Sequence, residues 1–217
     1  MLSYFYGKYY FCIMKRTTRN AVKTKQEIIE KSAPVFNVHG FAGTSMQMLV
    51  NATGYQMGGI YRHFDTKMDL AKAVFQYNYE TLSKGNLELA ASLNPQEQLL
   101  TIIENYKKMV INPQIAGGCP ILNTVTEVDD TNEEFRLLAK SFVKEILTTI
   151  QNILEEGRRT GFFKKSINSR KEALYLFATF EGAILIGKLT KSAKPIFDIF
   201  ETLRTYLEEL IFEDNKA

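Results

Sequence analysis

The sequence of 217 residues predicts an all-α protein with about nine helices. Apolar residues recur at helical spacing along most of the chain, and helix-capping patterns separate the resulting segments. No run of residues alternates between apolar and polar as a half-buried strand does. The expected helices form an N-terminal three-helix head with a helix-turn-helix, which we assign to residues 15–70, and a C-terminal helical body over residues 71–217.

The first fourteen residues form a separate segment, which we expect to be a sequence extension or a disordered arm. They are rich in aromatic side chains and lack the charged start and uniform apolar stretch of a signal peptide. Met14 is followed by the basic residues Lys15, Arg16 and Arg19, so we expect translation to begin at Met14. The basic residues either contact a polyanion or stay disordered.

The head is expected to begin with a helix from about residue 20 to residue 38. Its apolar residues recur at helical spacing, and the helix stops near Gly40. Pro34 removes one backbone donor inside this helix and is expected to bend its last turn. The apolar residues expected in the core of the head are Phe36, Leu49, Ile60, Phe64 and Leu70.

Two short helices follow in the head. Thr44 with Gln47 has the form of a capping box and predicts a second helix, which ends at Gly54. The third helix is expected to run through Ile60 to Phe64.

The body begins with two helices that carry clear start signals. Thr66 with Asp69 forms a capping box and predicts a long helix that reaches about residue 92. Asn94-Pro95 followed by Glu97 combines a cap, a proline in the first turn and an acid near the helix N-terminus. We therefore expect the next helix to start at this point.

The second half of the body starts after a break at 113–120, which contains two prolines and a pair of glycines. Thr131 with Glu134 is expected to cap a helix that runs to Gly157.

The last two helices are expected to hold a dimer together. Ser169 with Glu172 predicts a helix to about Lys191, and Pro195 lies in the first turn of a helix that ends near residue 213. The first of them is apolar on almost every side, so it has to be covered on every side. We therefore expect a homodimer through residues 169–191 and 195–213, with an all-internal core as the alternative.

Charge is divided unevenly along the chain, although the net charge is only +3. Residues 1–70 hold nine Lys or Arg and four Asp or Glu, a net charge of +5, and the remaining residues carry −2. A basic head on a mildly acidic body favours a polyanionic partner, although a solvated lysine surface gives the same division.

The stretch 40–70 carries the most informative pattern. A helix, a tight turn at Gly54-Tyr55 and a short second helix form a helix-turn-helix, which presents its second helix to the major groove of DNA. Gln56 can pair with adenine, Met57 can contact a thymine methyl group, and Gly58 and Gly59 allow close approach. The expected phosphate contacts are Thr44, Ser45, Tyr61, Arg62, His63 and Lys67.

Three of these donors have a simpler alternative. Tyr61 and His63 could serve only in packing, and Arg62 could be only a solvated charge.

This segment resembles the DNA-binding head of the TetR (tetracycline repressor) family of bacterial transcriptional regulators. The resemblance covers about residues 20–70, and the sequence departs from the family at Gln56, where Ser often caps the recognition helix. The residues that carry it are Phe36, Gly40, Thr44-Ser45, Leu49 and Gly54, followed by Gly58-x-Ile60-Tyr61-x-His63-Phe64-x-x-Lys67-x-x-Leu70.

The resemblance implies a ligand-responsive regulator, most simply a repressor, in the bacterial cytoplasm. It implies a homodimer that binds double-stranded DNA at a near-palindromic operator and releases it when a small molecule binds the body.

Aromatic and polar residues on the body helices are the candidates for the effector site, with ordinary core packing as the alternative. They are Phe75, Tyr79, Tyr106, Met109, Asn123, Phe142, Ile146, Phe177, Phe180 and Glu181. Glu181 stands out because an unpaired acid inside the most apolar helix is expensive to bury. It is expected to bond a ligand, to pair internally or to lie at the dimer edge.

Other classes of function have little support in the sequence. Two cysteines and two histidines offer no metal-ligand spacing, and no nucleophile elbow or nucleotide-binding glycine loop is present. We expect no enzyme activity, cofactor, metal or membrane partner, and we expect Cys119 to be a small buried thiol rather than a redox sensor. The remaining alternative is a helical module whose basic head binds a protein or an anionic membrane.

Overall fold

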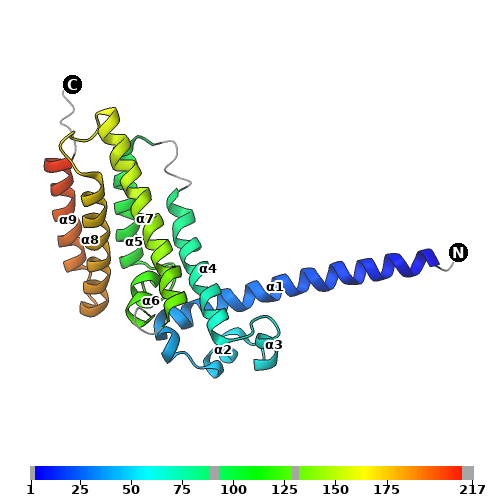
Figure 1. Ribbon diagram of the computed structural model, residues 1–217. Helices are drawn as coiled ribbons and strands as arrows, with labels where there is room; N and C mark the ends of the chain where they lie inside the picture. Colours follow the sequence, from blue (N-terminus) through cyan, green and yellow to red (C-terminus); the bar gives the residue numbers. More distant parts are fainter. Residues whose placement is uncertain (1–2, 88–92, 129–131, 212–217) are drawn as a thin grey trace. The chain divides into compact units, whose positions relative to one another are not determined.

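The computed structural model describes the backbone of residues 3–87, 93–128 and 132–211, and it confirms the predicted all-α architecture (Figure 1). Within these ranges the chain forms nine α-helices and a final π-helical turn, and it contains no strand. The elements are α1 (Ser3–Gly43), α2 (Met46–Thr53), α3 (Met57–Tyr61), α4 (Lys67–Leu87), α5 (Pro95–Ile111), α6 (Pro120–Val128), α7 (Glu133–Thr160), α8 (Ser169–Thr190), α9 (Lys194–Tyr206) and the π-helical turn Leu207–Ile211.

The chain divides into two compact units, Met1–Tyr77 and Asn78–Ala217. They correspond to the head and the body, and each is described by itself below. The expected boundary after residue 70 and the observed division after Tyr77 both fall within α4.

The first helix is longer than expected. Its helical backbone begins at Ser3 rather than near residue 20, and its side chains are described from residue 20 onward. The helix is interrupted at Gly40, where φ is 72° and ψ is 177°, rather than at Pro34, which lies within the helical part. A positive φ favours glycine, so the predicted stop at this residue has a local cause. The expected start of translation at Met14 stays a prediction.

Five apolar side chains form the predicted core of the head. Each is buried, with at most 8% of its surface exposed: Phe36, Leu49, Ile60, Phe64 and Leu70. They come from all four helices of this unit or from the turn after α3, and α1 packs against α2. The apolar residues predicted for the core of the head are therefore all buried.

The predicted capping box at Thr66 and the predicted cap at Asn94 are both confirmed. At α4, Thr66 N–H donates to the Asp69 carboxylate at 3.0 Å, and Asp69 N–H donates to the Thr66 hydroxyl at 3.1 Å. At α5, Asn94 N–H donates to the Glu97 carboxylate at 3.0 Å, and Glu97 N–H donates to Asn94 Oδ1 at 3.0 Å. Each pair satisfies amides that the helix itself leaves unbonded.

The cap of α2 lies one residue after the expected position. Ser45, not Thr44, accepts the N–H of Met48, at 3.2 Å. The Thr44 hydroxyl instead donates to the Gly40 carbonyl oxygen at 2.6 Å, and the side chain is buried. Adjacent hydroxyl residues can both fit a capping pattern, and the interruption at Gly40 gives the first of them a different partner.

The long helix α7 also departs from its predicted ends. Its cap is Asn132, whose side chain accepts the N–H of Phe135 at 2.8 Å, and the expected cap Thr131 lies outside the described residues. The helix continues past Gly157 to Thr160, and Gly161 caps it in the left-handed conformation. The prediction of an end at Gly157 is therefore wrong.

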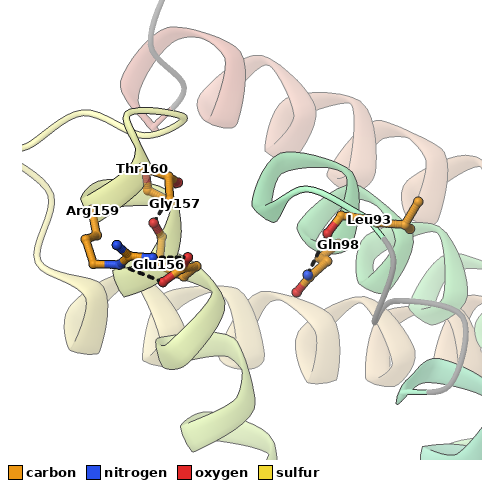
Figure 2. A network of polar contacts seen from close by, with 6 residues as sticks. All are labelled: Leu93, Gln98, Glu156, Gly157, Arg159 and Thr160. Carbon is orange, nitrogen blue, oxygen red and sulfur yellow. Dashed lines mark hydrogen bonds and ion pairs between the residues drawn. The ribbon is translucent and has the colours of Figure 1, made fainter.

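Gly157 has a packing role instead of a helix-ending role. A Cβ atom at this position would lie 2.1 Å from Cδ2 of Phe163, a fully buried ring that returns against the end of α7. Figure 2 shows this end of the helix, where Arg159 pairs with Glu156 at 2.6 Å and the Thr160 hydroxyl bonds the Glu156 carbonyl at 2.8 Å. The glycine is required by close approach rather than by a turn.

The cap of helix α8 is Asn168 rather than the expected Ser169. Asn168 Oδ1 accepts the N–H of Lys171 at 3.1 Å, and the Ser169 hydroxyl donates to Glu155 on α7 at 2.9 Å. The helix packs against α5, α7 and α9, which lie beside it in Figure 1.

Helices α5, α7, α8 and α9, with the segment between α7 and α8, build the core of the body. Its fully buried side chains include Leu99, Ile150, Leu154, Phe163, Leu176, Phe180 and Leu203. The other side of α8 stays open, and its exposed apolar residues are Leu174, Tyr175, Leu185, Ile186 and Leu189. In this unit, therefore, the all-round apolar helix is covered on one side only.

Candidate nucleic-acid interface and ligand site

The turn between α2 and α3 is fixed by short-range hydrogen bonds. Gly54 adopts the left-handed conformation at φ 76°, and its N–H donates to the Val50 carbonyl at 2.9 Å. The buried Thr53 hydroxyl donates to the Leu49 carbonyl at 2.7 Å and accepts the N–H of Tyr55 at 3.2 Å. This arrangement ends α2 at Thr53 and directs the chain into α3, which begins four residues later at Met57.

Helix α3 has one buried face and one open face. Ile60 is 1% exposed and belongs to the core, whereas Met57 and Tyr61 are 44% and 41% exposed. Gln56 is the N-cap residue, its side chain is exposed, and it makes no side-chain capping bond. A Cβ atom added at Gly58 would meet nothing within 4 Å. The open face therefore combines two projecting side chains with a side-chain-free patch of backbone.

The remaining predicted contact residues follow along or just after α3. Gly59 is partly buried, Arg62 is exposed and His63 is partly buried. Lys67 lies at the start of α4, with Nζ 4.4 Å from the centre of the Phe41 ring, so its ammonium group is held near the head by a cation–π contact.

Thr44 and Ser45, the two phosphate contacts expected at the N-terminus of α2, differ in how exposed their side chains are. The Ser45 side chain is exposed, while the Thr44 side chain is buried and its hydroxyl is used by the Gly40 carbonyl. A phosphate contact at Thr44 would therefore have to come from its backbone amide.

Tyr55 is a residue of the head that the sequence patterns did not single out. Its hydroxyl donates to Glu27 Oε2 on α1 at 2.7 Å, and this bond lowers the pKa of Glu27 and raises the pKa of Tyr55. Lys31, also on α1, donates to the Thr53 carbonyl at 3.1 Å, with its ammonium 5.9 Å from the Tyr55 ring centre. The turn of the helix-turn-helix is thus tied to α1 at two points.

In the body, the side chains of Cys119, Glu181 and Tyr106 form a polar cluster. The Cys119 thiol donates to Glu181 Oε1 at 3.2 Å, although the two residues are 62 positions apart. Tyr106 belongs to the same cluster, because the charges of Glu181 and Cys119 both raise the pKa of its phenol. Burial is the larger cause at Tyr106 and Cys119, and it raises both pKa values well above their usual range. The prediction of a buried Cys119 thiol is confirmed.

The cluster lies among stacked aromatic rings. Tyr106 stacks on Phe180 with ring centres 4.2 Å apart, and Tyr79 stacks on Phe142 at 4.0 Å. Burial and a hydrogen bond from its phenol to Glu145 raise the pKa of Tyr79. Four of the predicted ligand residues therefore form two aromatic pairs in the body.

The other ligand candidates are arranged differently. Asn123 bonds the Gly117 carbonyl at 2.9 Å and accepts from Lys188 Nζ at 2.5 Å, so it joins the loop before α6 to α8. Phe75 is buried within the first unit rather than in the body. Three further candidates are partly buried side chains of the body: Met109, Ile146 and Phe177.

Metal ligands and membrane-spanning helices were not expected in this chain. Across the described residues, no group of three or more His, Cys, Asp or Glu side chains could hold a metal ion. One described helix, Ser169–Thr190, is long and apolar enough to cross a membrane by length and composition alone. A core helix of a soluble protein passes the same criterion, and this one packs against three other helices.

Comparison with known proteins gives a consistent result. Residues 28–74 match the family model for bacterial regulatory proteins of the tetR family, and residues 95–203 match the tetracyclin repressor-like C-terminal domain. The chain is 26% identical over 193 residues to the HTH-type transcriptional repressor DhaR of Mycobacterium sp. strain GP1. The aligned region covers 86% of this chain and 95% of that protein.

Solved structures match both units of the chain. A TetR-family regulator from Cytophaga hutchinsonii is 33% identical, with a TM-score of 0.81 and coverage of 90% of this chain and 98% of that one. A TetR regulator from Chloroflexus aurantiacus J-10-FL is 30% identical, with a TM-score of 0.84 and coverage of 89% and 98%.

Proposed function

The chain belongs to the TetR family of bacterial transcriptional regulators, and from this premise we propose that it is a homodimeric repressor whose operator is released by a small molecule. It is a DNA-binding regulator of the bacterial cytoplasm rather than an enzyme. The observation that carries the proposal is the open face of α3, which is held in a fixed turn and is free of bulky side chains at Gly58.

The open face of α3 fits the major groove of DNA. Gln56 and Met57 reach base edges, where an amide can pair with adenine and a thioether can contact a thymine methyl group. Gly58 and Gly59 let the helix approach closely. The phosphate contacts come from donors around this face: Ser45, the Thr44 amide, Tyr61, Arg62, His63 and Lys67.

The homodimer forms through α8 and α9. Leu185 and Leu189 are 56% and 80% exposed on α8, and Phe197 is 46% exposed on α9. Large exposed apolar side chains on these two packed helices are the surface that we assign to the dimer. A two-fold pair places its two recognition helices one turn of DNA apart, about 34–36 Å, so the operator is a near-palindrome.

The body supplies the response to a ligand. A small molecule that binds one conformation of the body more tightly shifts the dimer toward it, by no more than its difference in affinity for the two states. When that conformation no longer presents the heads at the spacing of the operator, DNA is released. The aromatic pairs and the cluster around Glu181 are the candidate ligand site.

The decisive experiment is selection of bound duplexes from a random pool, together with the DNA upstream of the protein's own gene. We expect an enriched near-palindrome whose binding weakens steeply with salt. Binding to anionic lipid vesicles with no enriched duplex would instead support the alternative, an interaction module with a basic head. Absence of any enriched sequence would overturn the assignment of α3 to base recognition.

A further inference from the structure

We propose that Glu181 is the recognition group of the effector site and that the effector is a protonated organic amine. The proposal rests on the proposed function, because it names the ligand class of the body site. It concerns an acid on α8 whose neighbours leave one carboxylate oxygen without a bonding partner.

The two oxygens of Glu181 have different surroundings. Oε1 accepts the Cys119 thiol at 3.2 Å. Oε2 is buried and has no hydrogen-bond partner within the part of the chain that the structure describes. A buried acceptor without a donor loses the hydrogen bonds it would make in water, so a group that brings a donor to Oε2 removes this cost.

The contact from Cys119 depends on the loop before α6. Gly117 and Gly118 have φ values of 104° and 81°, and a Cβ atom at Gly118 would lie 3.4 Å from both Ile184 and Lys188. The loop therefore passes directly against α8 and delivers the thiol to one oxygen of Glu181. The second oxygen remains available to a ligand.

The environment favours a ligand that carries positive charge. No basic side chain of the described residues pairs with Glu181; its neighbours are the Cys119 thiol and the Tyr106 phenol, and Tyr79 faces Tyr106 in turn. Desolvation by burial is the main cause that raises the pKa of Glu181 to about 7. A cation beside the carboxylate offsets this desolvation, and the partly buried Tyr106 ring can pack against the apolar part of an organic cation.

An amine is favoured over a metal ion and over an anion. A metal needs several ligating groups, whereas Glu181 is a single carboxylate. An anion would bind only while Glu181 is protonated, so its affinity would fall as pH rises. A protonated amine provides both the positive charge and the N–H donor that Oε2 needs. Tyr106 and Glu181 are partly rather than fully buried, so the cluster lies near the surface of the body.

The sign of the pH dependence follows from these groups. A cation binds the ionised carboxylate, and ionisation of Glu181 increases through its pKa of about 7. The affinity for an amine should therefore rise about tenfold between pH 6 and pH 8 and change little above pH 8. A neutral alcohol of the same skeleton should show no such rise.

The test uses the full chain and calorimetric titration with three matched probe pairs at pH 6 and pH 8. The pairs are benzylamine, phenethylamine and cyclohexylamine, each against the alcohol of the same skeleton. We expect at least one amine to bind about tenfold or more tightly than its alcohol at pH 8 and to release the selected operator duplex.

Three variants assign the effect to one carboxylate. Glu181→Gln should remove both the amine preference and its pH dependence, and Glu181→Asp should retain the pH dependence. Glu156→Gln, an exposed acid on α7, is the matched control and should behave as the wild type. Equal binding of amine and alcohol in all three pairs, or an amine preference that survives in Glu181→Gln, would overturn the inference. Because operator binding is measured in the same samples, its loss would be recognised separately as failure of the proposed function.

Discussion

The hydrogen bonds that shape the head and those of the candidate ligand site in the body join residues at very different separations along the sequence. The turn of the head uses bonds between close neighbours, such as Thr53 to Leu49 and Ser45 to Met48. The polar contacts of the candidate ligand site join distant residues, with Cys119 and Glu181 62 positions apart and Asn123 and Lys188 65 apart. A local motif can be read along a sequence, whereas a site assembled from distant segments depends on how the helices pack.

The largest loss of operator affinity is expected from changes on the exposed side of α8 in the body. The double variant Leu185→Glu/Leu189→Glu places two charges on the exposed side of α8, where the proposed dimer would desolvate them. We expect a monomer by light scattering and a loss of operator affinity of about 1000-fold or more, because one head alone binds half a site.

The matched control for the dimer is Leu137→Glu on α7, which is 49% exposed and lies on neither α8 nor α9. It should remain dimeric. If the double variant on α8 also remained dimeric, the two chains would have to pair through a surface other than α8.

A second prediction addresses the head. Tyr61→Ala/Lys67→Ala removes two expected phosphate contacts and should lower affinity for every duplex, by about 100-fold at moderate salt. Lys67→Ala should also reduce the slope of affinity against salt by about one. Fluorescence anisotropy with operator and unrelated duplexes measures both effects, and Lys165→Ala in the loop after α7 controls for the loss of one charge. Binding equal to the wild type would refute the placement of DNA on this face.

A third prediction concerns packing in the body. Gly157→Ala should lower the free energy of unfolding by about 1–3 kcal/mol, because the new methyl group overlaps the Phe163 ring. Chemical denaturation measures this change. Adding Phe163→Leu should recover part of the loss, and a Gly157→Ala protein as stable as the wild type would contradict the close approach described above.

The smallest loss of operator affinity is expected from breaking the hydrogen bond between Tyr55 and Glu27, which are far apart in the sequence of the head. Tyr55→Phe removes the bond to Glu27 while keeping the ring, so the turn before α3 is held less firmly to α1. We expect operator affinity to fall about threefold to fivefold with a smaller loss for unrelated duplexes, because base contacts depend more strictly on the orientation of α3 than phosphate contacts do. Glu27→Gln should act in the same direction. An equal loss for both kinds of duplex would indicate a general role in folding instead.

How much the sequence could predict differs along the chain for physical reasons. The fold class, the helix-turn-helix, the capping box at Thr66 and the cap at Asn94 depend on neighbouring residues, and these were correctly predicted. The caps of α2 and α8 were misplaced by one residue, because two adjacent polar side chains fit each capping pattern. Thr44 bonds the nearby Gly40 carbonyl instead, and Ser169 bonds Glu155 on α7.

Other features could not be predicted, because they depend on long-range packing. Gly157 looked like a helix end until the position of Phe163 was known. Glu181 stood out as an acid in an apolar helix, but nothing along the chain indicated that Cys119 bonds it. The pair of glycines before Cys119 was the one sequence signal for such a close approach.

Gly118 also limits how this site can change during evolution. Any other residue there would strain the backbone, since φ is 81°, on a loop that already lies in contact with Ile184 and Lys188 of α8. Substitution at this position is therefore a poor route to a new ligand preference. Lineages that acquire different effectors are expected to vary instead at Tyr106, Phe180 and Glu181, whose side chains can be exchanged while the loop keeps its course.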